Sequence, residues 1–294
     1  MLKNNLKHAV LIRTYNRSDL LKNCLESLDN QTFKDFNVYI SDDSTANVNE
    51  NVIDFFKNKL NIYYFKNQKQ LKFSALTFNE VLKKVNNEKY ISILDDDDHW
   101  DENRMFEVNN QLASGKNWVT HYYKFVTNTS LKEYDNVIFK HEEIKSKKDV
   151  IPNSSKYFGA PSFHTIDIEI FKKIGNWDST FRRGPCQEWF TRARINGYEC
   201  FVIKEIYGTY LMNNKSITLA GSKESFNDEV DTRIKFINKY NSYFSFIKIL
   251  VTSYSSAMLK NSFFHKLNKG NYKSNLYIFL MNILILLKKV VKTN

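Results

Sequence analysis

The sequence of 294 residues has little glycine, proline or cysteine. Its 8 Gly and 3 Pro are too few for a collagen-like or low-complexity chain. Its three cysteines, Cys24, Cys186 and Cys200, are too few and too scattered for a disulfide framework or a cysteine-rich zinc site. No apolar run near the start resembles a signal peptide, and no stretch reaches the ~18 apolar residues of a membrane span. These absences favour a protein of the reducing cytosol.

Apolar and aromatic residues are plentiful. They make up 42% and 15% of the chain, with 23 Phe and 17 Tyr. This is enough to build a large core and excludes wholesale disorder. The length suits one large α/β domain, or a smaller domain with an appendage.

The positive charge is concentrated at one end of the chain. The formal net charge is +11, but eleven of the 43 Lys and Arg residues and none of the 32 Asp and Glu residues lie in 232–294. Residues 1–231 are therefore neutral. The sequence predicts a neutral domain followed by a basic, aromatic tail.

Short apolar runs alternate with helical patterns in the first half. We expect strands at 8–13, 36–41, 62–65 and 90–94, with helices near 20–28, 52–60 and 78–85. This alternation predicts an α/β fold with a mostly parallel sheet and helices on both faces. The second half predicts helices near 102–112, 166–174 and 187–196, strands near 118–125 and 199–206, and a helical pattern beyond about 223.

Polar or acidic residues follow three of the early strands. Thr14-Tyr15-Asn16, Asp42-Asp43 and the four aspartates 95–98 come directly after apolar runs. The carboxyl ends of parallel strands meet at one crevice, so these residues are expected to converge. Four neighbouring aspartates repel one another, and oxygen ligands suit Mg²⁺ or Mn²⁺, which would offset the charge of a diphosphate leaving group. A solvated acidic turn or an adventitious Ca²⁺ loop is the alternative, and it stays open.

Several motifs, in order along the chain, resemble those of family-2 glycosyltransferases of the GT-A fold, over about residues 7–220. They are VLIRTYNR at 10–17, QTF at 31–33 with VYISDDS at 38–44, YISILDDDD at 90–98, IGNWD at 174–178 and QEW at 187–189. The resemblance implies a Rossmann-like, mostly parallel sheet flanked by helices. The helical pattern beyond about 223 adds a C-terminal helical appendage to this fold.

The resemblance also implies roles for single residues. Donor binding falls to Thr14, Tyr15, Asn16, Arg17, Asp43, Lys72, Asp95 and Asp96. Tyr15 would stack on the donor base and Asp43 would accept a hydrogen bond from it. Asp97 and Asp95 would hold Mn²⁺ or Mg²⁺, and Glu188 would be the general base.

Two positions depart from the family's pattern. Glu188 stands where the family usually has Asp, and the extra methylene shifts the carboxylate by about a bond length. Residues 210–213 read Tyr-Leu-Met-Asn, without the His that the family often has there. The sequence has no Gln-x-x-Arg-Trp motif and no transmembrane bundle, so a processive polysaccharide synthase is not expected.

The expected function is therefore an inverting, metal-dependent transfer of one sugar from a nucleotide-sugar donor. A UDP-sugar is the first choice by resemblance, and the acceptor would be a carbohydrate or lipid-linked saccharide in bacterial surface-polysaccharide or lipopolysaccharide synthesis. The catalytic domain is expected at 1–222, with a donor half at about 1–100 and an acceptor half at about 101–222, followed by a basic helical extension at 223–294. The alternative is a non-catalytic basic protein whose tail binds anionic membrane or nucleic acid, but that does not explain the aspartates.

The extension contains a short apolar segment flanked by lysines. Residues 276–287 are apolar except Asn282, and as a helix they would be ~18 Å long, too short for the ~30 Å hydrocarbon core. The flanking lysines are Lys266, Lys269, Lys273, Lys288, Lys289 and Lys292. Residues 266–292 could lie on an anionic membrane surface, or the helix could pack on the domain, and both alternatives stay open. We expect a cytoplasmic protein, peripheral on the inner face of the membrane in the first case, with no nucleic-acid partner.

Overall fold

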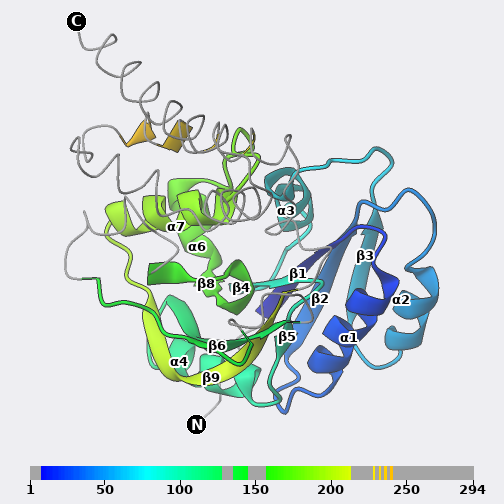
Figure 1. The fold of residues 1–294 in the computed structure, drawn as a ribbon, viewed down its shortest axis with the longest axis horizontal. Coiled ribbons are helices and arrows are strands. Elements are labelled where there is room, and N and C mark those ends of the chain that lie inside the picture. The colour runs from blue at the N-terminus through cyan, green and yellow to red at the C-terminus, as the bar shows by residue number, and fades with distance from the viewer. Residues whose placement is uncertain are drawn as a thin grey trace, which may run out of the picture.

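The computed structural model describes residues 8–127, 135–144 and 157–212, together with 228, 232, 235, 236, 239 and 240. Its strands form one sheet in the order β3-β2-β1-β4-β8-β6-β9-β5, with β7 paired to β6 (Figure 1). The strands are β1 (His8–Thr14), β2 (Phe36–Asp42), β3 (Ile62–Lys66), β4 (Tyr90–Asp95), β5 (His99–Trp100), β6 (Trp118–Thr127), β7 (Ile138–Phe139), β8 (Thr165–Asp167) and β9 (Phe201–Met212). The helices are α1 (Ser18–Asp29), α2 (Glu50–Phe56), α3 (Ser74–Leu82), α4 (Arg104–Ala113), α6 (Ile168–Ile174) and α7 (Pro185–Ile195), with a short 3-10 helix η2 (Pro161–Phe163).

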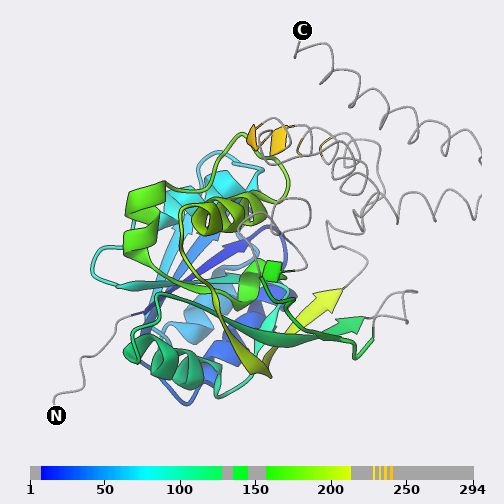
Figure 2. The same ribbon diagram turned by 90° about the vertical axis from the view of Figure 1, so that its left-hand side faces the viewer.

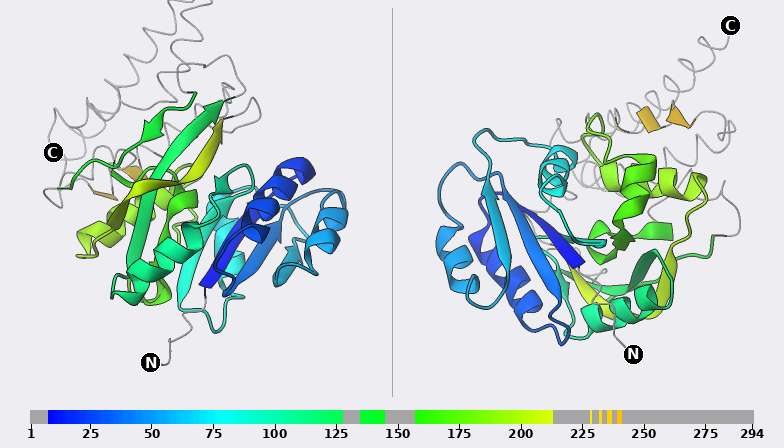
Figure 3. Two further views of the ribbon diagram at one scale, coloured as in Figure 1. Left: turned by 90° about the horizontal axis from the view of Figure 1, so that it is seen from below. Right: turned by 180° about the vertical axis from the view of Figure 1, so that it is seen from behind.

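The first four strands are parallel and lie between two helix layers. β1, β2 and β4 are almost entirely buried, whereas β3, at the end of the strand order, is partly exposed. Alternate residues of β1 face opposite sides, because side chains along a strand alternate between the two faces of the sheet. Val10 and Ile12 belong to a core shared with α1 and α2, whereas Ala9 and Leu11 belong to a core shared with α3, α6 and α7. Figure 3 shows α1 and α2 (blue) on one side of these strands and α3 (cyan) on the other.

The second half of the sheet is mixed. β8 is antiparallel to both β4 and β6, whereas β6 and β9 are parallel with a register shift at Tyr122. Figure 2 shows β6 and β9 running out together beyond the body of the domain. β8 thus joins the parallel half of the sheet to the long strand pair β6–β9, on which β7 and β5 add short strands.

The expected α/β class with helices on both faces of the parallel strands is confirmed, and each strand and helix expected within 8–212 is present, with ends shifted by a few residues. The short strands β5, β7 and β8 and the helix η2 were not predicted. The apolar segment 276–287 and its flanking lysines lie outside the described residues. In the part of the chain that the structure describes, no helix combines the length and apolar character needed to cross a membrane.

Candidate active site

Strand register brings the ends of β1, β2 and β4 together. Arg13 pairs with Asp95 of β4 on one side, and Thr14 pairs with Asp42 of β2 on the other. The Asp43 N–H donates to the Thr14 carbonyl at 2.9 Å. The polar residues predicted to converge therefore lie at one edge of the sheet, as the sequence indicated.

The four aspartates that follow β4 have different surroundings. Asp95 accepts from Arg13 Nε at 2.8 Å. Asp96 Oδ1 and Asp97 Oδ2 both face Arg17 Nη1, at 3.2 and 3.3 Å. Asp98 is fully buried and accepts from the Leu211 N–H at 3.1 Å and from the Ser162 hydroxyl. Residues 95–97 therefore face the cationic side chains of Arg13 and Arg17. Asp98 instead stabilises the loop through its hydrogen bonds.

Crowding and burial disfavour a fully ionised cluster. Burial, followed by the charges of Asp95 and Asp96, raises the pKa of Asp97 to about 7. Burial also raises the pKa of Asp96, against the opposing effect of Arg17, and raises that of Asp98 well above its usual range. A further cation at this place would favour the ionised forms.

The residues present fit a divalent cation bound together with a substrate. The described residues contain no preformed cluster of three His, Cys, Asp or Glu side chains. However, Mg²⁺ is typically held by one or two carboxylates plus substrate phosphates. Asp95 and Asp97 supply hard oxygen ligands, and Asp96 Oδ2 is buried without a hydrogen bond of normal geometry. Such an atom can accept from a ligand or its hydration shell.

Some of the residues predicted to bind the donor are exposed, and others form hydrogen bonds within the loops that carry them. Tyr15 is 44% exposed, a large aromatic surface beside the strand ends. Asn16 has a positive φ of 52°, and its N–H donates to Ser44 Oγ at 2.7 Å. Asp43 is buried and accepts from the Leu71 and Lys72 N–H groups, both at 2.8 Å. Asp43 therefore fixes the loop that carries the exposed Lys72, and its contact with a donor base stays a prediction.

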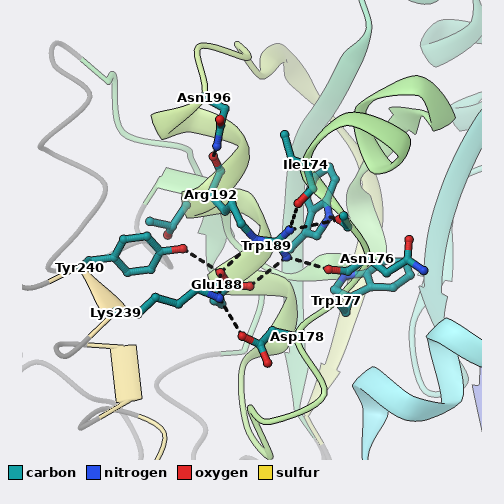
Figure 4. Close-up of polar contacts among 12 residues, drawn as sticks. Ile174, Asn176, Trp177, Asp178, Glu188, Trp189, Arg192, Asn196, Lys239 and Tyr240 are labelled. Carbon is teal, nitrogen blue, oxygen red and sulfur yellow. Dashed lines mark hydrogen bonds and ion pairs between the residues drawn. The ribbon is translucent and has the colours of Figure 1, made fainter.

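Glu188 lies in the first turn of α7 and is fully buried (Figure 4). Arg192, one turn later, donates Nε and Nη2 to its two oxygens, both at 3.1 Å. Lys239 Nζ at 2.9 Å and the Tyr240 hydroxyl at 2.7 Å also contact Oε1. In the described part of the chain no hydrogen bond or ion pair joins Glu188 to residues 95–97. Its role as general base stays a prediction, and it would require one of these donors to withdraw.

Further contacts extend the Glu188 cluster into the preceding loop. Arg192 donates to the carbonyls of Ile174, Gly175 and Asn176, the last at 2.7 Å. Lys239 also donates to Asp178 at 2.7 Å. Although burial opposes it, hydrogen bonds from Lys239 and Thr180 lower the pKa of Asp178 to about 2. The cluster ties α7, the loop before it and the residues near 240 together (Figure 4).

The first turn of α7 also holds a buried thiol, that of Cys186, two residues before Glu188. Burial, followed by the charge of Asp95, raises the pKa of the Cys186 thiol.

Sequence reasoning missed several residues of the site. Arg13 precedes Thr14 in the quoted motif, so its contact with Asp95 could have been inferred from the strand register. Ser162, which holds Asp98, lies in η2, where no periodic pattern points to it. Lys239 and Tyr240 are more than 50 residues beyond Glu188, and nothing local signals their contact.

The sequence is similar to those of known glycosyltransferases. The family model described as glycosyl transferase family 2 matches residues 9–175, more than half of the chain. A GalNAc(5)-diNAcBac-PP-undecaprenol beta-1,3-glucosyltransferase from Campylobacter jejuni is 25% identical over 228 residues, 75% of this chain and 70% of that protein.

Solved structures share the fold. Staphylococcus aureus TarS 1–349 in complex with UDP-GlcNAc has a TM-score of 0.63 at 15% identity, over 84% of this chain and 70% of that one. Mannosyltransferase PcManGT from Pyrobaculum calidifontis, in complex with GDP-Man and Mn²⁺, has a TM-score of 0.59 at 11% identity, over 98% and 88%. The chain spans 65% of another TarS 1–349 structure and 43% of a longer TarS structure. With its GT-A fold and the match over more than half its length, the chain belongs to glycosyl transferase family 2 and is a glycosyltransferase.

Proposed function

We propose that this glycosyltransferase moves one sugar, with inversion, from a UDP-sugar to a carbohydrate or lipid-linked saccharide, in a divalent-metal-dependent reaction. The observation that carries the proposal is the placement of Asp95, Asp96 and Asp97 at the carboxyl end of β4, in register with the end of parallel β1, which the exposed Tyr15 follows. Open α/β sheets bind ligands at this edge. The pathway we propose is assembly of a bacterial surface polysaccharide or lipopolysaccharide, and the C. jejuni relative, whose name specifies an undecaprenol-linked substrate, supports a lipid-linked acceptor.

Asp97 and Asp95 would hold Mn²⁺ or Mg²⁺ together with the donor diphosphate. When bound, the ion supplies positive charge that stabilises the leaving diphosphate. Two observations support this proposal. The carboxylates of residues 95–97 lie together at one edge of the sheet, where Arg13 and Arg17 already pair with them. The PcManGT structure is a complex with Mn²⁺.

Thr14, Tyr15, Asn16, Asp43 and Lys72 would bind the nucleotide. A ring as exposed as that of Tyr15 can stack on a base, since base–aromatic stacking is worth about 1–3 kcal/mol. Lys72 presents its ammonium from a loop that Asp43 fixes. The UDP-GlcNAc complex of TarS supports a UDP-sugar as the first donor to test.

Glu188 would take the proton from the acceptor hydroxyl as that oxygen attacks the anomeric carbon opposite the leaving diphosphate. A single displacement of this kind inverts the anomeric centre. The Tyr240 hydroxyl, 2.7 Å from Oε1, occupies a position that an acceptor hydroxyl would need. The proposal therefore includes withdrawal of Tyr240 when acceptor binds.

For the whole chain we propose a catalytic domain at 1–222 and a basic extension at 223–294 that brings the enzyme to the inner membrane surface. Among the described residues of the extension, Asp228 pairs with Arg182 at 3.1 Å and Lys235 donates to the Thr180 carbonyl at 2.6 Å. These contacts give the extension a docking place beside the acceptor half.

A thermal-shift experiment separates this function from that of a non-catalytic basic protein. The melting temperature is measured with UDP-, GDP- and dTDP-sugars, each with Mn²⁺ and with EDTA. We expect a rise with one nucleotide class that depends on Mn²⁺. No rise with any nucleotide, together with a rise on anionic vesicles, would favour the non-catalytic alternative.

A further inference from the structure

We propose that Ser162 is a positioning residue for the aspartates that would hold the metal. Its hydroxyl fixes both ends of the turn that carries Asp96 and Asp97, and the affinity for the divalent cation depends on that hydroxyl. This inference rests on the proposed function. It adds a residue that acts on the ion only through the aspartates, and it commits to a change in Mn²⁺ affinity that a loss of packing elsewhere in the core would not cause.

The aspartates form a tight turn at the end of β4. The Asp98 N–H donates to the Asp95 carbonyl at 3.1 Å and closes a four-residue turn, with Asp96 and Asp97 in the middle. The backbone of this turn sets the directions in which its side chains leave the chain. The placement of the Asp97 carboxylate relative to that of Asp95 therefore depends on the turn keeping its shape.

One hydroxyl holds both ends of the turn. Ser162 Oγ accepts from the Asp95 N–H at 3.1 Å and donates to Asp98 Oδ2. A hydroxyl has one donor and two acceptor positions, so a single serine can bond an N–H and a carboxylate at the same time. The Ser162 carbonyl also accepts from Trp100 Nε1 at 2.7 Å. Ser162 thus contacts the first and last residues of the turn and the strand β5 that follows it.

The position of Ser162 is itself tied to β4. Ser162 is fully buried in η2, two residues before β8 begins. The Ile93 N–H of β4 donates to the His164 carbonyl at 3.3 Å, and Thr165 of β8 pairs with Ser92 of β4. The hydroxyl is therefore held against the same strand that leads into the turn.

Repulsion among the aspartates favours opening of the turn, because like charges that lie close together disfavour one another. Without the Ser162 hydroxyl, the Asp95 N–H loses its acceptor. In the described part of the chain, the Asp98 carboxylate would then keep one hydrogen bond, from the Leu211 N–H at 3.1 Å. The turn would be held less firmly, and Asp95 and Asp97 would be less well placed to share one cation.

Electron paramagnetic resonance of free Mn²⁺ tests the inference without any turnover. Mn²⁺ affinity is measured in the presence of UDP for the wild type, Ser162→Ala, Ser162→Cys, Ser92→Ala and Lys22→Gln. The thiol of Ser162→Cys is a weaker donor and acceptor than the hydroxyl. Lys22 pairs with Glu26 on the exposed face of α1, so its variant is a surface control. Circular dichroism sets a temperature at which the variants are folded.

Ser92→Ala is the matched control for the loss of a buried hydroxyl. Ser92 is fully buried in β4, and its hydroxyl bonds Thr165 Oγ1 at 2.7 Å and accepts from Arg104 Nη1 at 3.2 Å. Among the described residues it has no hydrogen bond to 95–98. Its removal therefore lowers stability without releasing the turn.

We expect Ser162→Ala to bind Mn²⁺ about 10- to 100-fold more weakly than the wild type, the range typical for a residue that orients a metal ligand. Ser162→Cys is expected to lose affinity by a smaller factor, and it replaces Ser162→Ala in the comparison if the latter does not fold. Ser92→Ala and Lys22→Gln are expected to match the wild type in Mn²⁺ affinity, although Ser92→Ala should lower the melting temperature.

Three results would overturn the inference, and they are distinguishable. If the folded Ser162 variants bind Mn²⁺ as tightly as the wild type, while Asp97→Asn abolishes binding, the metal site stands and the role of Ser162 is wrong. An equal loss of affinity in Ser92→Ala would show that Ser162 has no special role. If the wild type binds no Mn²⁺ even with UDP, the proposed metal dependence fails and the inference falls with it.

Discussion

Replacing Glu188 by glutamine is expected to lower the free energy of unfolding as well as the rate of transfer. The fully buried carboxylate accepts from Arg192, Lys239 and Tyr240 at 2.7–3.1 Å. Glutamine has nearly the same shape but no charge, so it leaves two cations facing a neutral amide. The Tyr240 hydroxyl can still donate to the amide oxygen.

The magnitude follows from how deeply the pairs are buried. Removing one partner of a buried ion pair costs about 3–5 kcal/mol, because the remaining charge loses its compensation. Lys239 is 34% exposed and Arg192 17%, so water partly solvates them and the lower end applies. A loss of ~3 kcal/mol in a domain of about 200 residues corresponds to a melting temperature lower by ~6–12 °C.

Scanning calorimetry or a denaturant titration at pH 7 measures this loss. Tyr240→Phe is the matched variant, because it removes one hydrogen bond and leaves all charges, and it is expected to cost only ~1 kcal/mol. Transfer is then measured for each variant at a temperature where it is folded. A fall of ~10²-fold or more for Glu188→Gln at full folding is expected for a general base.

Two outcomes would refute this reasoning. An unchanged melting temperature for Glu188→Gln would show that the contacts with Arg192 and Lys239 do not stabilise the fold. Transfer close to the wild type in the folded variant would assign the base to another residue and leave Glu188 as the anchor of α7.

Three further predictions concern the crevice, the sheet and the extension. Because the pKa of Asp97 is raised to about 7, the metal-free protein should lose stability as pH rises from about 4 to 7. The Asp97→Asn variant should lose less stability over the same pH range, and an equal fall in melting temperature for the two proteins would contradict this. Gly208→Ala should cost about 1–3 kcal/mol in a denaturant titration, since its Cβ would lie 2.5 Å from buried Phe163, and an unchanged midpoint would contradict it. Co-sedimentation with anionic vesicles should weaken in high salt and disappear on truncation after Gly270, and equal partitioning of both forms would exclude a membrane role for 266–292.

The parallel half of the fold could be predicted because buried parallel strands read as apolar runs. β1, β2 and β4 are such runs, and knowing that their carboxyl ends meet was sufficient to bring Thr14, Asp43 and Asp95 together. β5 and β8 are two and three residues long, too short for any periodicity to appear. Their pairing depends on partners more than 40 residues away.

The surroundings of single carboxylates could not be predicted either, because their partners are also far away in the sequence. Asp97 and Asp98 are adjacent in sequence, yet one faces Arg17 and the other Ser162, because backbone geometry turns them apart. The sequence marked Glu188 correctly as a residue of the first turn of a helix. It carried no sign that Lys239 and Tyr240 would fold back onto that carboxylate.

The central claim is that Asp97 and a divalent cation together serve transfer from a nucleotide-sugar. Release of UDP from UDP-sugars, with and without a saccharide acceptor, measures it in the wild type and in Asp97→Asn, each with Mn²⁺ and with EDTA. We predict release that needs Mn²⁺ in the wild type and falls by ~10²-fold or more in folded Asp97→Asn, while Lys22→Gln matches the wild type. Release that persists in EDTA, or equal release by Asp97→Asn and the wild type, would contradict the account.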